Sequence, residues 1–109
     1  MAYDRDLAER IRGLLPDEPV VEKAMFGGLA FLVGGHMAVA ASGKGGLMLR
    51  CDPVDSDRLV SEPGASRMVM RGKEMDGWLR VTSEAVADDE DLSRWIGVGA
   101  SYAASLPPK

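Results

Sequence analysis

The stretch from Met25 to Gly35, which reads MFGGLAFLVGG, constrains the fold more than any other part of the chain. It has the apolar density of a buried β-strand, yet it carries two glycine pairs. Gly34-Gly35 indicates a tight hairpin, because glycine tolerates the positive φ angles of such turns. Gly27-Gly28 lies where a strand begins, and glycine there indicates a bulge or the close approach of another backbone or a ligand.

The neighbouring segments predict a mainly antiparallel sheet of about five strands. Three short apolar runs, separated by Gly34-Gly35 and by the glycine-rich segment 43–46, are typical of a three-stranded meander. Two further runs flank a turn that we expect at 72–76. The five expected strands cover residues 25–33, 36–42, 47–51, 67–71 and 77–82.

Apolar residues spaced three and four apart predict a helix at each end of the chain. The first ends before Pro16, and the last begins near Asp88. Between them, Asp52-Pro53 supplies an N-cap acceptor and a residue suited to a first helical turn, so we expect a short helix that reaches Val60. The predicted fold class is therefore α+β, a two-layer sandwich of terminal helices on the sheet, with residues 1–109 forming one domain.

Charge and composition limit the classes of function. The 109-residue chain is 46% hydrophobic and 28% charged, with a net charge of -4, so it should fold unaided and we expect no direct DNA binding. Cys51 is the single cysteine, which suits a reducing compartment. The N-terminus has no apolar signal-peptide core, and no apolar run approaches the roughly 18 residues of a membrane helix. These features predict a cytoplasmic protein that does not contact a membrane.

The residue types of most catalytic and metal sites are scarce. With His36 and Cys51 as the single histidine and cysteine, the chain cannot supply a zinc ligand set of those residues. The segment SGKGG is not a phosphate-binding P-loop, because Ala38 stands where that motif needs its first glycine. The acidic run 88–91 lacks the glycine and glutamate of a calcium loop and is better explained as a helix cap. We therefore expect no metal, no cofactor and no enzymatic activity.

One sheet face combines apolar and basic side chains. Side chains alternate along a strand, so Met48 and Arg50 share a face, and Trp78 and Arg80 share a face on the last strand. If Met37, Val39 and Ala41 point to the core, the small Ala38 and Ala40 lie on the same side and let another surface come close. Two interpretations stay open at this point: a binding surface, or a solvated sheet face with scattered arginines.

Glycines and basic residues in the loops suggest a second candidate site. Successive glycine amides beside Lys44 can form a weak nest for an anion. The segment 67–80 also has a local excess of basic over acidic residues. The residues of this candidate anion or small-molecule site are Gly27, Gly28, Lys44, Arg71 and Lys73.

A set of residues spread over nearly the whole chain resembles the TfoX N-terminal domain family, also called TfoX/Sxy. The residues that carry the resemblance are Met25, Phe26, Gly27, Gly28, Met37, Leu49, Arg50, Gly72, Met75, Gly77 and Trp78. The resemblance implies helices packed on an antiparallel sheet, similar to the YjbR and secretion-chaperone-like architectures.

The resemblance also implies a class of function. Longer members of the family regulate natural competence, act with the cyclic-AMP receptor protein at promoters and carry a second, C-terminal helical domain. This chain ends at Lys109, so we expect a stand-alone domain. We predict a non-enzymatic protein-interaction module, an accessory regulator of transcription or of competence-like processes, whose partner is another protein or a second copy in a homodimer. A small-molecule or anion-binding domain is the alternative.

Overall fold

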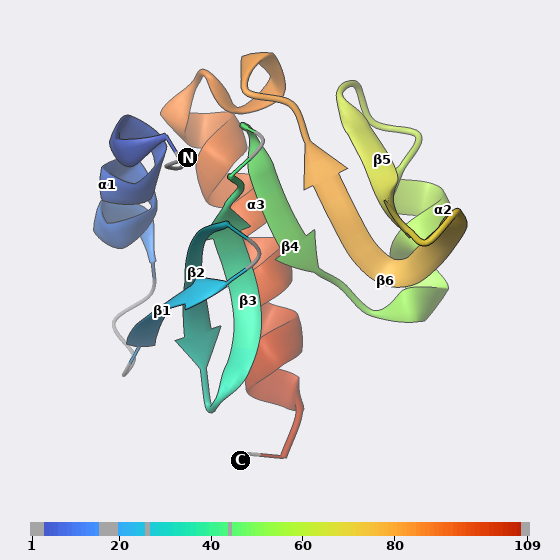
Figure 1. Ribbon diagram of the computed structural model, residues 1–109, viewed down its shortest axis with the longest axis horizontal. Coiled ribbons are helices and arrows are strands. Elements are labelled where there is room, and N and C mark those ends of the chain that lie inside the picture. Colours follow the sequence, from blue (N-terminus) through green and yellow to red (C-terminus); the bar gives the residue numbers. More distant parts are fainter. Residues whose placement is uncertain (1–3, 16–19, 26, 44, 108–109) are drawn as a thin grey trace.

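The computed structural model describes residues 4–15, 20–25, 27–43 and 45–107. Six antiparallel strands form one sheet in the order β1-β2-β3-β4-β6-β5, with helices packed on one face (Figure 1). The α+β fold class is therefore confirmed. The strands are β1 (Val20–Met25), β2 (Gly28–Val33), β3 (His36–Ala41), β4 (Leu47–Arg50), β5 (Ala65–Met70) and β6 (Lys73–Val81).

Three helical elements begin at acidic caps, and the sequence predicts those at Asp52 and Asp88. Asp4, Asp52 and Asp88 each accept a backbone N–H bond at a helix N-terminus, which satisfies donors that the helix itself leaves free. Among the described residues, no helix is long and apolar enough to cross a membrane. The helical elements are α1 (Arg5–Leu14), η1 (Pro53–Asp55), α2 (Ser56–Leu59), η2 (Glu84–Val86) and α3 (Asp89–Ser105).

The sheet has one more strand than the sequence predicts. We expected a single strand over 25–33, but β1 ends at Met25 and β2 begins at Gly28, with Gly27 between them at a φ of 74°. β1 is an edge strand whose Val21 is 62% exposed. Because β1 is paired on one side and exposed on the other, it lacks the continuous apolar run that identifies a buried strand.

The main core lies between the sheet and the helices. Phe31, Leu49 and Leu79 from the strands meet Trp95 and Ile96 of α3, and all five are buried. α3 approaches β3 closely at Gly99, where a Cβ would overlap the Ala38 carbonyl oxygen. A larger residue at that position would push the helix off the sheet.

Two details of the strands differ from the sequence prediction. The pairing of β2 with β3 shifts register between Phe31 and Leu32, which places Ala38 against α3 while Met37 joins the opposite face. The expectation that Ala38 lies on the same sheet face as Met48 is therefore wrong, whereas Ala40 does lie on that face. The predicted turn at 72–76 is also misplaced, since Arg71 and Gly72 form it with φ values of 52° and 77° and β6 begins at the next residue.

Candidate interaction surface

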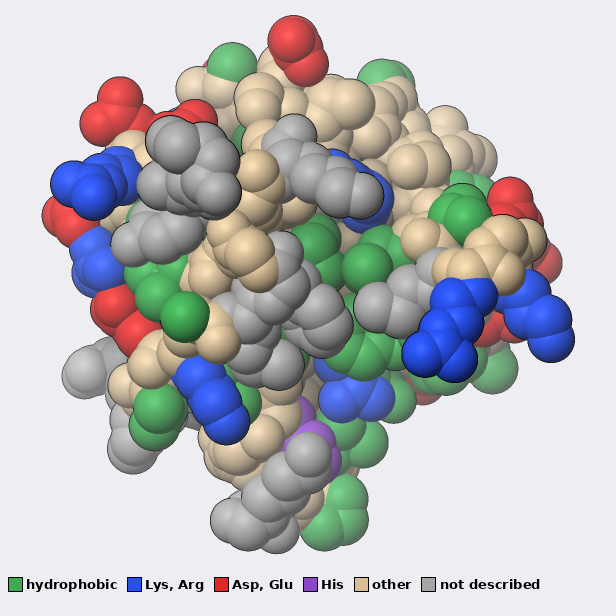
Figure 2. Space-filling view, viewed as in Figure 1, with side chains coloured by type: hydrophobic (Ala, Val, Ile, Leu, Met, Phe, Trp, Pro, Cys, Tyr) green, Lys and Arg blue, Asp and Glu red, His purple; other side chains and the backbone are tan. Residues whose placement is uncertain are grey.

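The sheet face opposite the main core carries its own apolar cluster, and we call it the outer face. Figure 2 shows this side of the molecule, with hydrophobic side chains gathered near its middle and Lys and Arg side chains around them. The buried members of the cluster form its floor, and Leu32 and Trp78 pack against them half-buried. The buried members are Ala30, Met37, Ala40, Met48 and Met68.

The structure brings the predicted interface residues together. Met48 is paired with Arg80, and Arg50 with Trp78, across β4 and β6. Met48 is only 3% exposed, so it belongs to the floor and not to the accessible surface. Arg50, Trp78 and Arg80 are half-buried, and they form the accessible part of the predicted surface.

Arg50 lies against two aromatic rings from different elements. Its guanidinium carbon Cζ is 5.0 Å from the Trp78 ring centroid and 5.4 Å from that of Tyr102 on α3. Both distances fall within the range of a cation–π contact. Sequence reasoning missed Tyr102, because its spacing assigns it to the apolar face of the last helix and no local pattern links it to Arg50.

Arg50 has no hydrogen bond or ion pair within the part of the chain that the structure describes. Its Nε atom is buried, and no described residue offers it a hydrogen-bond acceptor. Arg80 makes one long hydrogen bond, 3.4 Å from Nη2 to the Gly45 carbonyl oxygen. Other arginines lie within ion-pair distance of a carboxylate, namely Arg10, Arg12, Arg58, Arg67 and Arg94. Within the described residues, the outer face therefore presents two arginines, Arg50 and Arg80, that have no acidic partner.

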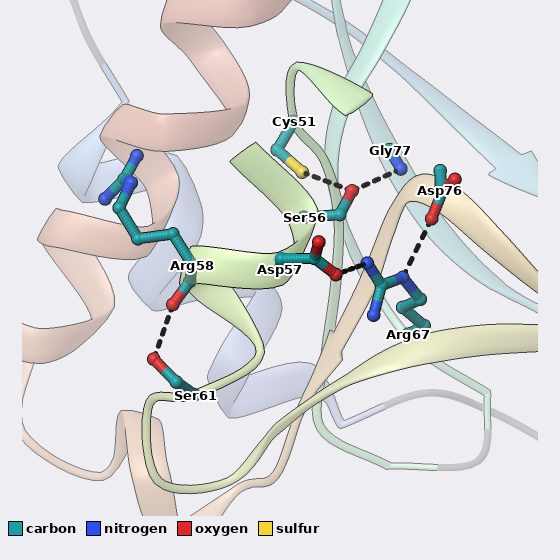
Figure 3. Close-up of polar contacts among 8 residues, drawn as sticks. All are labelled: Cys51, Ser56, Asp57, Arg58, Ser61, Arg67, Asp76 and Gly77. Carbon is teal, nitrogen blue, oxygen red and sulfur yellow. Dashed lines mark hydrogen bonds and ion pairs between the residues drawn. The ribbon is translucent and has the colours of Figure 1, made fainter. Parts of the chain in front are cut away.

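A buried hydroxyl fixes the end of β4 beside β6. Ser56 Oγ accepts a 2.8 Å hydrogen bond from the Gly77 N–H and lies 3.9 Å from Cys51 Sγ (Figure 3). Burial raises the pKa of the Cys51 thiol above its ordinary value. The contact with Ser56 lowers this pKa by a smaller amount. Cys51 is thus a protonated packing residue at neutral pH.

An ion-pair cluster lies next to this hydroxyl, on the exposed side of the β5–β6 hairpin. Arg67 binds Asp57 of α2 and, at 2.9 Å from Nε to Oδ1, Asp76 of β6 (Figure 3). Both carboxylates raise the pKa of the guanidinium, with Asp57 contributing more. The cluster joins α2 to the hairpin that carries Trp78.

The second candidate site is not assembled as predicted. Gly27 and Gly28 follow β1, whereas Arg71 and Lys73 belong to the hairpin of β5 and β6 at the opposite edge of the sheet. Lys44 lies outside the described residues. In the glycine-rich loop, the Gly45 N–H already donates to the Ser42 carbonyl oxygen. The described residues of this set therefore do not form one anion site.

The glycine pair has a structural explanation. Gly27 has a positive φ, and a Cβ at Gly28 would overlap the Ala41 carbonyl oxygen and lie 2.9 Å from the Gly43 nitrogen. The predicted close approach is therefore made by the chain's own backbone.

His36 has a structural contact. Its Nε2 donates to the Pro107 carbonyl oxygen at 2.7 Å, which ties the start of β3 to the segment after α3. Among the described residues, no three His, Cys, Asp or Glu side chains are grouped so that they could hold a metal ion.

A match to a family model identifies the class of protein to which this chain belongs. The model of the TfoX N-terminal domain matches residues 13–103, and the chain therefore belongs to the TfoX N-terminal domain family. The match covers the strands that bear Arg50 and Trp78, and α3 as far as Ala103. No curated protein and no solved structure matches the chain.

Proposed function

We propose that this domain is a non-enzymatic protein-interaction module that uses the outer face as its contact surface. The observation that carries the proposal is the combination of Trp78 with Arg50 and Arg80, two arginines without a carboxylate partner within the described chain. Tryptophan and arginine are the residue types most enriched at the energetic centres of protein interfaces. An acidic, partly apolar surface on the partner would complement this face.

The chemistry of the lone cysteine and histidine favours binding over catalysis. Cys51 is 1% exposed and its pKa is raised, which makes its thiol a poor nucleophile. The Nε2 of His36 is engaged by the Pro107 carbonyl. Both residues have structural roles that account for them.

Family membership supports an accessory role in transcription or in competence-like processes. The net charge of -4 favours contact with a protein over direct contact with DNA, because few phosphates could be neutralised at once. The module would then act in the cytoplasm, through a regulator that itself binds the promoter.

A second copy of the chain is the simplest partner to test. In a symmetric dimer, each Trp78 would be buried against the partner's sheet and the arginines would reach carboxylates at the rim. Sedimentation of the wild type at roughly tens of micromolar protein should show a dimer, since a specific interface commonly has a micromolar or lower Kd. Arg50→Glu should shift it toward the monomer.

Arg5→Glu is the matched control for that measurement. It makes the same charge change on exposed α1, where a carboxylate in the first turn suits the helix dipole. Equal dissociation of both variants would contradict the outer face as the interface. A wild-type monomer would exclude a second copy and leave a different protein as the partner.

A further inference from the structure

We propose that Arg50, together with Trp78 and Tyr102, forms the receptor for a single carboxylate group of the protein partner, an inference that rests on the proposed function. The carboxylate would come from an Asp or Glu side chain or from a chain terminus. The site is built from three elements, since Arg50 ends β4, Trp78 lies on β6 and Tyr102 lies on α3.

The two aromatic rings suit a guanidinium that binds an anion. A guanidinium contacts rings through its flat face, while its N–H donors point outward in its own plane. The contacts at 5.0 and 5.4 Å stabilise the charge of Arg50, but they supply no oxygen acceptor for its N–H donors. Arg50 is half-buried, and partial burial strengthens an ion pair formed there.

The acceptor that Arg50 needs is not provided by the described chain. A buried polar atom without a hydrogen-bond partner, such as the Nε of Arg50, is uncommon in folded proteins. The acid nearest in sequence, Asp52, accepts a 3.1 Å hydrogen bond from the Val54 N–H as the cap of η1. Arg67, by contrast, has two carboxylate partners, Asp57 and Asp76.

A single guanidinium at the site favours a carboxylate over a phosphate. A carboxylate is planar and singly charged, and one arginine fork can bind both of its oxygens. Phosphate sites more often combine several basic side chains or a cluster of backbone N–H groups. The second unpaired arginine of the outer face, Arg80, instead pairs across the strands with Met48 and bonds to the Gly45 carbonyl.

The test is a titration of the isotopically labelled protein followed by NMR. The probes are acetate and the blocked tripeptide Gly-Glu-Gly, with chloride at matched ionic strength and Gly-Gln-Gly as controls. We expect acetate and Gly-Glu-Gly to shift the Arg50 Nε–H signal and the Trp78 indole signal along saturating curves. The indole signal of Trp95, which is 1% exposed, should not shift. Shifts of equal size with chloride or with Gly-Gln-Gly would overturn the proposal.

Variants of Arg50 distinguish bidentate binding by its guanidinium from a general effect of positive charge. Arg50→Lys keeps the positive charge but loses the two-pronged guanidinium. The apparent affinity for Gly-Glu-Gly, measured from the shift of the Trp78 indole signal, should therefore fall at least tenfold. Arg5→Gln removes an exposed arginine of α1, outside the outer face, and should leave the Arg50 response unchanged. Circular dichroism establishes that each variant is folded. A response that survives in Arg50→Lys, or one lost in Arg5→Gln, would contradict the assignment to Arg50.

The titrations distinguish a carboxylate carried on a polypeptide from a free carboxylate. Together with the variants, they also distinguish failure of the carboxylate receptor from failure of the proposed function. Tighter binding of Gly-Glu-Gly than of acetate supports a carboxylate carried on a polypeptide, whereas tighter binding of acetate would contradict a protein source. If neither probe binds but Arg50→Glu still dissociates a complex, the carboxylate receptor is wrong and the interaction surface stands. If the probes bind but no complex depends on the outer face, the proposed function is wrong.

Discussion

Arg50 and Trp78 face each other as a directly paired residue couple on β4 and β6, with the guanidinium carbon 5.0 Å from the ring centroid. Cross-strand pairs of this kind stabilise a sheet as well as shape its surface. The same two residues therefore serve folding and the proposed binding function.

Replacement of Trp78 by alanine should lower the free energy of unfolding by about 2 kcal/mol. The ring is half-buried, so the loss should be roughly half of the ~3–5 kcal/mol that truncation of a buried aromatic residue costs. Trp78→Phe should retain most of the stability. Urea denaturation measures both variants, and an unchanged midpoint for Trp78→Ala would show that the ring contributes no packing.

Gly28→Ala should destabilise the fold by more than about 2 kcal/mol, because the new Cβ would overlap the backbone of β3. Gly13→Ala is the matched control. Gly13 lies in α1 with no atom near its missing Cβ, so alanine there should stabilise the helix by about 0.5–1 kcal/mol. A melting temperature of Gly28→Ala within a degree or two of wild type would contradict the close approach.

Cys51 should react with thiol reagents only when the protein unfolds. Its side chain is buried, and burial raises the pKa of the thiol above its ordinary value. Ellman's reagent at neutral pH should label the folded protein far more slowly than the denatured chain. Rapid labelling under native conditions would show that the end of β4 opens.

The same pKa shift sets a direction for stability against pH. The folded state holds the thiol proton more tightly than the unfolded state, so this contribution to stability is fully present below the ordinary thiol pKa of about 8.5. It is lost as the pH rises through the raised pKa. Cys51→Ala should flatten this alkaline decline in urea denaturation midpoints, whereas an unchanged pH dependence would contradict it.

Direct binding to duplex DNA should be absent at physiological salt. The chain has an acidic excess, and several of its arginines are neutralised by neighbouring carboxylates. An electrophoretic mobility assay with a duplex probe should show no shift. A complex with a Kd below about 1 µM would favour direct recognition of DNA over an accessory role.

Helix-capping and turn residues in the sequence predicted much of the fold. The acids at Asp52 and Asp88 marked helix starts, and Gly34-Gly35 marked the turn between β2 and β3, because capping and turn geometry depend on adjacent residues. Strand β1 escaped prediction because it lies at the edge of the sheet with Val21 exposed. Its pairing depends on β2 and leaves little apolar pattern in its own residues.

The candidate surface was predicted in part. Alternation along β4 and β6 correctly grouped Arg50, Trp78 and Arg80 on one face. It could not show that Met48 is buried, nor that the register shift beside Leu32 moves Ala38 to the other face. The contact of Arg50 with Tyr102 joins β4 to α3, so tertiary packing alone creates it.

Site-specific photo-cross-linking in the cells that make the protein tests the outer face as an interaction surface most directly. A photoreactive amino acid would replace Arg80 on the outer face or, as the control, Val54, which is 84% exposed on η1. We predict one discrete adduct from position 80, none from position 54, and loss of the adduct when Arg50→Glu is added. Its mass distinguishes a second copy from another protein. No adduct from position 80, or equal adducts from both positions, would contradict the account.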